Sequence, residues 1–280
     1  MGYFKGWYFK CCNKDKTIAF IPAYHRVGRK VTASLQIITD DQVFCIPFPS
    51  LQYQEKPLSV RIGDCFFGQK GIRLNIRKKD LCIKGVLRFS HFSPIQYDIM
   101  GWFRWIPFMQ CRHSVYSMEH DIEGWVEMNG IKYEFQNGKG YLEGDRGRSF
   151  PEEYIWTQSF FEKGSLMLSV ADIPLFGFHF TGIIGVVLLK GKEYRIATYR
   201  GASVKHIGGN AVTIKQGDCE LTAMLMEKNA HPLHAPVGGR MSRTIHESPS
   251  CKAKYLFSDR GVLLCDFISD RASFEFEYNS

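Results

Sequence analysis

The stretch NGIKYEF, Asn129 to Phe135, decides the fold class. An Asn-Gly pair favours a two-residue turn, because both residues tolerate a positive φ. From Ile131 to Phe135, apolar and charged residues then alternate. That period of two is typical of a strand with one buried face. The stretch therefore predicts an antiparallel β-hairpin.

Similar alternating runs flank short polar turns elsewhere in the chain, at 212–226, 255–268 and 274–278. A helical period is nearly absent, so the sequence predicts an all-β, antiparallel protein. Two segments begin alike, Gly6 to Lys10 and Tyr154 to Gln158, and each places a tryptophan near the start of a series of strands. We therefore expect two barrel-like or sandwich halves, one domain at 1–150 and the other at 151–280.

Composition and charge narrow the classes of partner. The 280 residues suffice for a sizeable core, and the 14% aromatic content favours a β protein that holds a ligand inside. A net charge of +8 makes nucleic acid and an anionic membrane candidate partners. The densest basic stretch, Arg73 to Lys84, alternates with apolar residues and indicates the solvent face of a hairpin instead. We expect no nucleic-acid partner and no membrane span, and leave a peripheral membrane contact open.

Nine cysteines are scattered without a CxxC pair, and Cys11 and Cys12 are adjacent. No signal-like segment precedes the first strand-like run, which begins at Phe4. These features predict free thiols, no disulfide and a cytoplasmic location.

The run GKGYLEGDRGRSFPEEYIWTQ, Gly138 to Gln158, combines glycines, charges and aromatics and reads as a loop that forms the wall of a site. Glu143 and Asp145 are two residues apart, so on an extended segment they share a face. If both point inward, repulsion and desolvation raise one pKa and leave an acid in the site. The alternative is that they pair with Arg146 and Arg148 and brace the loop.

Aromatic residues and histidines supply further candidates. Trp7 and Trp156 offer ring faces that stabilise a cation, with core packing as the alternative. His113 and His120 lie on one strand-like run, as structural histidines or as a proton relay. No histidine spacing matches a metal motif, so we expect neither metal nor cofactor.

The segment Ser90 to Cys111 breaks the alternation and carries Phe103 and Trp105 among other aromatics. It predicts either a connection packed across a barrel end or an apolar rim through which a lipid-like molecule enters.

Four blocks of the chain resemble the tocopherol cyclase family, and in particular its bacterial tocopherol-cyclase-like branch. They are YFKGWYFK (Tyr3–Lys10), MGWFRWIPFMQCRHSVYSMEHDIEG (Met100–Gly124), GYLEGDRGRSFPEEYIWTQ (Gly140–Gln158) and PLHAPVGGRMSRTIHES (Pro232–Ser248). The chain departs from the family pattern at Lys5, where the family has Glu, at Gly144, where it has Lys, and at Arg146, where it has Trp.

The resemblance implies lipocalin-like β-barrels with an apolar pocket. The implied activity is that of a cofactor-independent isomerase, an intramolecular lyase, or of a hydratase, which acts on a prenylated or other apolar substrate. Family members close a chromanol ring from a prenylquinone-derived hydroquinone, by adding a proton to an alkene and capturing the cation with the phenol oxygen. The implied acid is Asp145, tuned by Glu143, with His113 next. The predicted substrate contacts are Trp7, Trp156, Arg146, Arg148, His120, Phe103 and Trp105. The alternative is a non-catalytic carrier or sensor that binds an apolar ligand.

Overall fold

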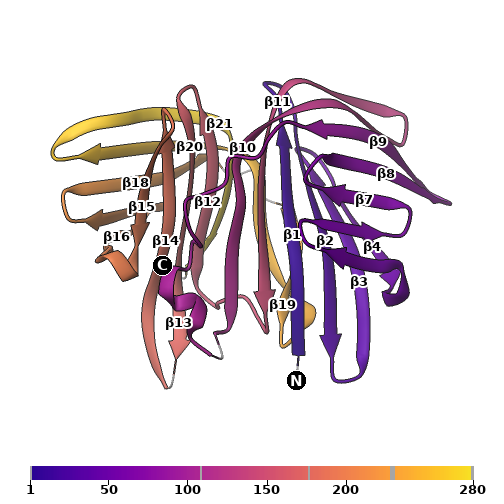
Figure 1. Cartoon of the computed structure of the whole chain (residues 1–280), viewed down its shortest axis with the longest axis horizontal. Coiled ribbons are helices and arrows are strands. Elements are labelled where there is room, and N and C mark those ends of the chain that lie inside the picture. Colours follow the sequence, from indigo (N-terminus) through magenta and orange to yellow (C-terminus); the bar gives the residue numbers. More distant parts are fainter. Residues whose placement is uncertain (1, 108, 176, 228–230, 279–280) are drawn as a thin grey trace.

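The computed structural model describes residues 2–107, 109–175, 177–227 and 231–278, which form two large antiparallel sheets (Figure 1). The predicted all-β class is confirmed. Helix in the described part of the chain is limited to three short 3-10 turns, η1 (Ser50–Gln52), η2 (Gly101–Trp105) and η3 (Thr198–Arg200). No helix in those ranges combines the length and the apolar character needed to cross a membrane.

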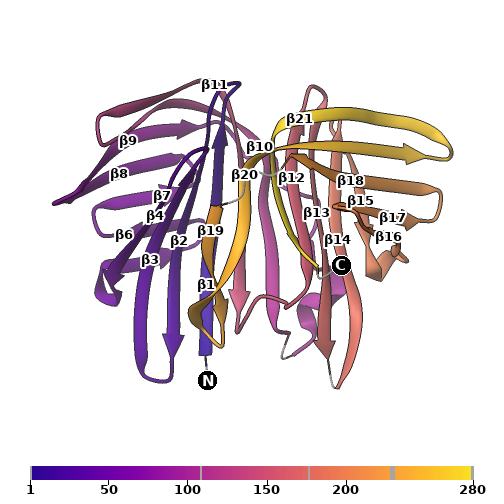
Figure 2. The same cartoon turned by 180° about the vertical axis from the view of Figure 1, so that it is seen from behind.

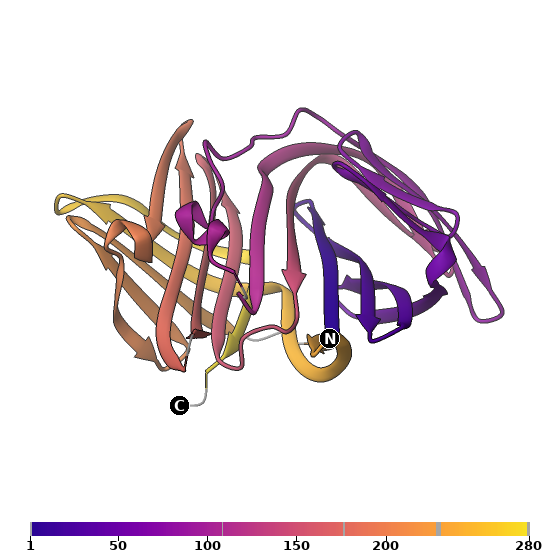
Figure 3. The same ribbon diagram turned by 60° about the horizontal axis from the view of Figure 1, so that its bottom comes forward.

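The first sheet has the strand order β4-β3-β2-β1-β11-β10-β9-β8-β7-β6-β5. Its strands are β1 (Gly2–Cys12), β2 (Thr17–Val27), β3 (Lys30–Thr39), β4 (Val43–Pro49), β5 (Tyr53–Lys56), β6 (Ser59–Ile62), β7 (Cys65–Gly68), β8 (Gly71–Lys78), β9 (Leu81–Phe89), β10 (Cys111–Met128) and β11 (Ile131–Gly147). The sheet curls around its own core like a half-barrel, so that β3 and β6 come into contact (Figure 3).

The second sheet has the order β15-β14-β13-β12-β21-β20-β18-β17-β16, with β19 paired to β20. Its strands are β12 (Tyr154–Phe161), β13 (Gly164–Leu175), β14 (Phe178–Leu189), β15 (Lys192–Ala197), β16 (Ser203–Gly208), β17 (Ala211–Gln216), β18 (Cys219–Glu227), β19 (His231–Val237), β20 (Arg240–Asp259) and β21 (Val262–Glu277). The division into domains at residue 150 stays a prediction, although each sheet draws its strands from one side of it.

The predicted hairpin at Asn129 is confirmed. Asn129 and Gly130 have φ angles of 49° and 85°, and Met128 on β10 pairs with Ile131 on β11. Positive φ at both central residues is the geometry that matches the twist of the flanking strands. Phe135 points into the core of the first sheet and is fully buried.

The run from Gly138 to Gln158 is not a loop, which corrects the prediction. Its first part belongs to β11 and its last part to β12, with only a short connection between them. The glycines allow close packing rather than a turn. A Cβ on Gly140 would lie 2.3 Å from Nε2 of His120, so only glycine lets that side chain pack across the strand.

Three apolar clusters hold the molecule together. One fills the curl of the first sheet and includes Phe9 and Phe20, and a second fills the curl of the other sheet and includes Tyr255 and Phe257. The third includes Tyr141 and lies between the sheets, where residues from both halves meet.

A hairpin of β19 and β20 fastens the second half onto the first, and Figure 2 shows it beside β1. The side-chain amide of Gln36 exchanges two hydrogen bonds of 3.3 Å with the backbone of His234. The backbone N–H of Phe150 donates to the carbonyl of Pro236 at 3.1 Å. These bonds fix the two walls of the space between the sheets.

Candidate functional site

The principal cavity lies between the two sheets and has a volume of about 170 Å³. Its lining is mostly apolar, and the η2 connection contributes Met100 and Phe103 while the β19–β20 hairpin contributes Leu233 and Ile245. Most of its buried apolar wall belongs to the third cluster rather than to the interior of either curl. The expectation of a pocket inside a barrel is therefore replaced by a pocket between two sheets.

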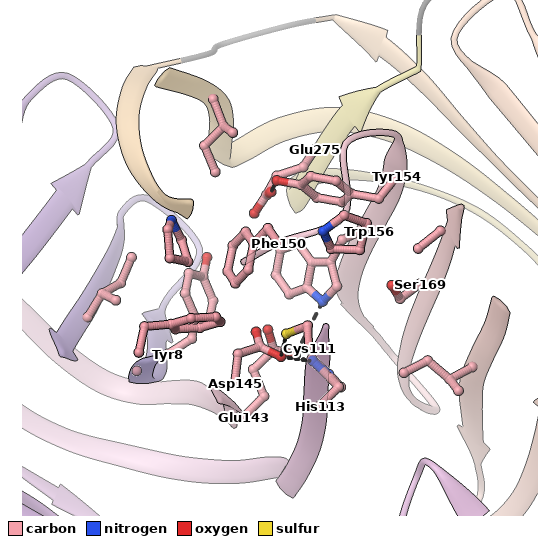
Figure 4. Close-up of a pocket in the computed structure, with 18 of the residues that line it drawn as sticks. Tyr8, Cys111, His113, Glu143, Asp145, Phe150, Tyr154, Trp156, Ser169 and Glu275 are labelled. Carbon is pink, nitrogen blue, oxygen red and sulfur yellow. Dashed lines mark hydrogen bonds and ion pairs between the residues drawn. The ribbon is translucent and has the colours of Figure 1, made fainter. Parts of the chain in front are cut away.

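A histidine between two carboxylates forms one side of the cavity (Figure 4). Nδ1 of His113 lies 2.9 Å from Oδ1 of Asp145, and its Nε2 lies 3.1 Å from Oε2 of Glu143. The register of β10 and β11 causes this, because His113 stands opposite Asp145 and Glu143 follows two residues away on the same face. Burial lowers the pKa of His113, but the two carboxylates outweigh it and hold that pKa well above its usual value.

Glu143 is held from two further directions. The Tyr141 hydroxyl donates to its Oε2 at 2.5 Å, and Nε1 of Trp156 donates to the same oxygen at 3.2 Å. The Cys111 thiol lies 3.5 Å from Oδ1 of Asp145. This side of the cavity is therefore built around the contacts of His113 with two hydrogen-bonded carboxyl groups.

Two more acids line the cavity, and sequence reasoning missed both. Burial, opposed by a Tyr8 hydrogen bond and reinforced by the charge of Glu143, raises the pKa of Glu247 to about 7. Burial also raises the pKa of Glu275 well above its usual value, with Glu247 adding to it, although the hydroxyl of Tyr154 donates to Glu275. Oε1 of Glu247 is buried without a hydrogen-bond partner among the described residues.

The two ends of the cavity differ in the charge of their ionisable groups. Figure 4 shows Glu275 and Tyr154 on the side opposite His113, with Trp156 between them. One end holds a charged cluster, while the other holds the carboxyl group of Glu275, whose raised pKa keeps its proton near neutral pH. Groups whose environments push their pKa values apart are suited to acid and base roles in one reaction.

The cluster also offers a candidate metal site. One ligand atom from each of His113, Glu143 and Asp145 can be chosen so that all lie within 4.8 Å of one another. In the structure Nδ1 of His113 is hydrogen-bonded to Asp145, whereas Nε2 lies 3.1 Å from Oε2 of Glu143 as an ion-pair contact that lacks hydrogen-bond geometry.

Six of the residues predicted from the sequence line the principal cavity. They are Asp145, Glu143, His113, Trp7, Trp156 and Phe103. The Trp7 indole, however, stacks on Tyr116 with ring centres 4.8 Å apart and donates to Glu55 at 3.1 Å, so its ring belongs to the first core.

The other four predicted residues lie apart from this cavity. Arg146 and Trp105 line a second cavity, described below, and Arg148 is in the lining of neither. His120 packs between Phe89 and Phe92, where burial lowers its pKa to about 3. A neutral, enclosed histidine fits the structural alternative.

In a comparison with known protein families, residues 69–174 match the family described as Tocopherol cyclase-like. A chloroplastic tocopherol cyclase from Zea mays is 30% identical over 63 residues, which is 22% of this chain and 13% of the plant protein. The family resemblance is confirmed, while these matches do not distinguish the bacterial branch. The matched segment is a small part of the plant enzyme.

Two solved structures share the fold. CghA with Sch210972 superimposes with a TM-score of 0.58 at 8% identity, over 98% of this chain and 88% of that one. Kievitone hydratase from Nectria haematococca gives a TM-score of 0.54 at 8% identity, with the same coverage. At such identity the likeness establishes the architecture of two sheets and not the chemistry.

Proposed function

We propose that this chain, which carries a tocopherol cyclase-like region, catalyses the acid-driven addition of an oxygen nucleophile to an alkene in an apolar substrate. The addition is a cyclisation when the oxygen belongs to the substrate, as in a prenylated phenol, and a hydration when it belongs to water. The substrate's apolar body occupies the cavity between the sheets, and the protein's own carboxyl groups and histidine supply the proton transfers.

The observation that carries this proposal is the buried carboxyl group of Glu247. It lines an apolar cavity, its Oε1 has no hydrogen-bond partner within the described ranges, and its pKa is raised to about 7. A general acid works best when its pKa lies near the working pH. Glu247 is therefore better suited to donate the proton than Asp145, which lies 2.9 Å from an imidazole nitrogen.

The cluster around His113 supplies the complementary role. Glu247 gives its proton to one alkene carbon, and the oxygen nucleophile bonds to the cation formed at the other. The nucleophile's proton passes to Asp145, which releases it to solvent, and solvent returns a proton to Glu247. With His113 protonated and both carboxylates ionised, the cluster carries one net negative charge, which stabilises a cation in a water-poor cavity.

The relatives support the reaction class without defining the substrate. The plant relative is named as a cyclase, and one structure of the same fold is named as a hydratase. Both names fit a proton-initiated addition to a prenyl group. The second candidate is a non-catalytic carrier, which the largely apolar lining of the cavity also fits.

The test is turnover of prenylated phenols and hydroquinones in D₂O. An acid that exchanges with solvent places deuterium on the product carbon, so mass spectrometry reports the proton transfer directly. Glu247→Gln should lower the rate by roughly 10²–10⁴-fold, the usual loss for a general acid. The matched control is Glu220→Gln, an ion-paired surface residue on β18.

The outcomes separate the two candidates. Product with carbon-bound deuterium that disappears in Glu247→Gln supports the enzyme. Tight binding of these compounds, with no product from any of them, supports the carrier. A copurified apolar molecule, identified by native mass spectrometry, supplies the natural ligand for repeating the test.

A further inference from the structure

A second cavity, of about 210 Å³, lies at the start of β10 beside the principal one. Met100 and His113 line both cavities. The remaining lining combines three arginines with one acid, one serine and one largely exposed tryptophan, and consists of Asp98, Arg104, Trp105, Arg112, Ser114 and Arg146. The reaction proposed above uses none of these six residues.

Three basic residues lie directly opposite one another on neighbouring strands, and their like charges repel. On three neighbouring strands, Lys5 of β1 pairs with Arg146 of β11, which pairs in turn with Arg112 of β10. Like charges placed directly opposite each other destabilise a sheet. Nζ of Lys5 is neutralised by Glu55 at 2.5 Å, and Nη2 of Arg112 donates to the carbonyl of Ile106 at 3.1 Å.

Arg146 is left without such a partner. Arg146 is exposed to solvent and makes no hydrogen bond or ion pair with any residue that the structure describes, and it lies between two other cations. Arg104 brings a third guanidinium from η2, and its Nη1 lies 3.6 Å from Oδ2 of Asp98. Three arginines against one carboxylate leave a net charge of about +2 among these four side chains.

We propose that this second cavity binds an anionic group, a carboxylate or a phosphate. Guanidinium groups bind such groups through paired hydrogen bonds, and three of them converge on one concave space. A bound anion would relieve the repulsion among these basic residues and occupy the donors of Arg146. This inference stands on the arginines alone and does not depend on the proposed reaction.

The shared wall suggests where the anion comes from. Because Met100 and His113 line both cavities, the two adjoin, and an amphiphile would place its head group among the arginines and its apolar body toward the principal cavity. A free inorganic anion would use only the arginines. The two sources share one chemistry, and the experiment distinguishes them.

The experiment is calorimetric titration of the whole chain with inorganic phosphate, octyl phosphate and octanol at low and at moderate salt. Arg146→Gln should lower the affinity for inorganic phosphate and for octyl phosphate by about tenfold or more, the usual loss for a charge-assisted hydrogen bond. Arg112→Gln should act in the same direction. Arg73→Gln, an exposed arginine on β8, is the control and should change nothing.

The three probes give distinct results. Octyl phosphate binding tighter than both phosphate and octanol identifies an amphiphile's head group, whereas octyl phosphate equal to phosphate identifies a free anion. Phosphate affinities that do not change in either arginine variant, or no phosphate binding at all, would overturn the proposal. Octanol reports the principal cavity separately, so failure here leaves the proposed reaction untouched.

Discussion

At the scale of single residues, the acids of the principal cavity differ in what the sequence could reveal. Glu143 and Asp145 could be paired from their spacing, because two residues on a strand always share a face. Glu247 and Glu275 could not, since each reaches the cavity only through a fold that joins segments more than 100 residues apart. No local motif marks a carboxyl group whose burial depends on a distant sheet.

Asp145→Asn tests whether Asp145 is the general acid predicted from the sequence or an ion-pair partner of His113. The amide keeps the shape of Asp145 but removes its charge, so His113 loses one of the two carboxylates that raise its pKa. We expect octanol affinity to stay within a few fold, because it depends on buried apolar area. Turnover should fall, and the pH at which His113 titrates should move down, as NMR of the imidazole would report. An unchanged His113 titration would contradict the pairing.

Glu247 should make the protein less stable as the pH rises. Its folded-state pKa of about 7 lies above the value of 4.5 for an exposed glutamate, so the folded state holds the proton more tightly. Stability is then highest below about pH 4.5 and declines up to about pH 7, by ~3 kcal/mol from this group.

Urea unfolding of the wild type and Glu247→Gln at pH 5 and pH 8 measures this effect. The glutamine variant does not titrate, so the wild type should lose stability relative to it between these two values. An equal difference at both pH values would show that Glu247 is not buried as an acid.

At the scale of elements, strand periodicity predicted the hairpin at Asn129 but misread Gly138 to Gln158. Glycines in a sequence predict a break in regular structure, whereas in β11 they allow neighbouring groups to approach. Nearly every residue from Gly138 to Gly144 is buried, because this strand has one face on the first core and the other on the cavity. An alternating pattern cannot appear in a strand that is covered on both sides.

Gly140→Ala should destabilise the protein by about 1–3 kcal/mol, the usual range for overpacking. The new Cβ would lie 2.3 Å from Nε2 of His120, which is itself enclosed by Phe89 and Phe92. Gly6→Ala is the control, because its Cβ would lie at an ordinary 3.7 Å from Cβ of Ala23. Denaturant unfolding of both variants checks the difference, and equal midpoints would contradict the tight packing.

At the scale of the whole molecule, the all-β class followed from local patterns, but the position of the cavity did not. Local alternation shows which face of a strand is apolar, whereas the packing of one sheet against another depends on residues from both halves. Tyr8 on β1 and Ser273 on β21 lie within hydrogen-bond distance, 3.3 Å between their hydroxyl oxygens, only because the two sheets pack together. No local sequence pattern predicts such a contact between residues of the two sheets.

The nine cysteines give a second test at this scale. All nine are unpaired in the structure, and only Cys45 and Cys82 are exposed. Burial raises the pKa of the Cys11 thiol well above its usual value, which disfavours the reactive thiolate. We expect two thiols to react quickly in the native protein and nine under denaturing, non-reducing conditions. A denatured count below nine would reveal a disulfide.

The cavity lies between two halves that each have their own hydrophobic core, so a bound ligand contacts both halves and stabilises their association. Each curl keeps its own apolar interior, so an empty cavity leaves the halves joined mainly through their outer faces and the β19–β20 hairpin. A bound molecule adds contacts to both walls and stabilises the state in which they are together. Calorimetric melting should therefore be broader, or in two stages, for the empty protein and become a single sharper transition on saturation.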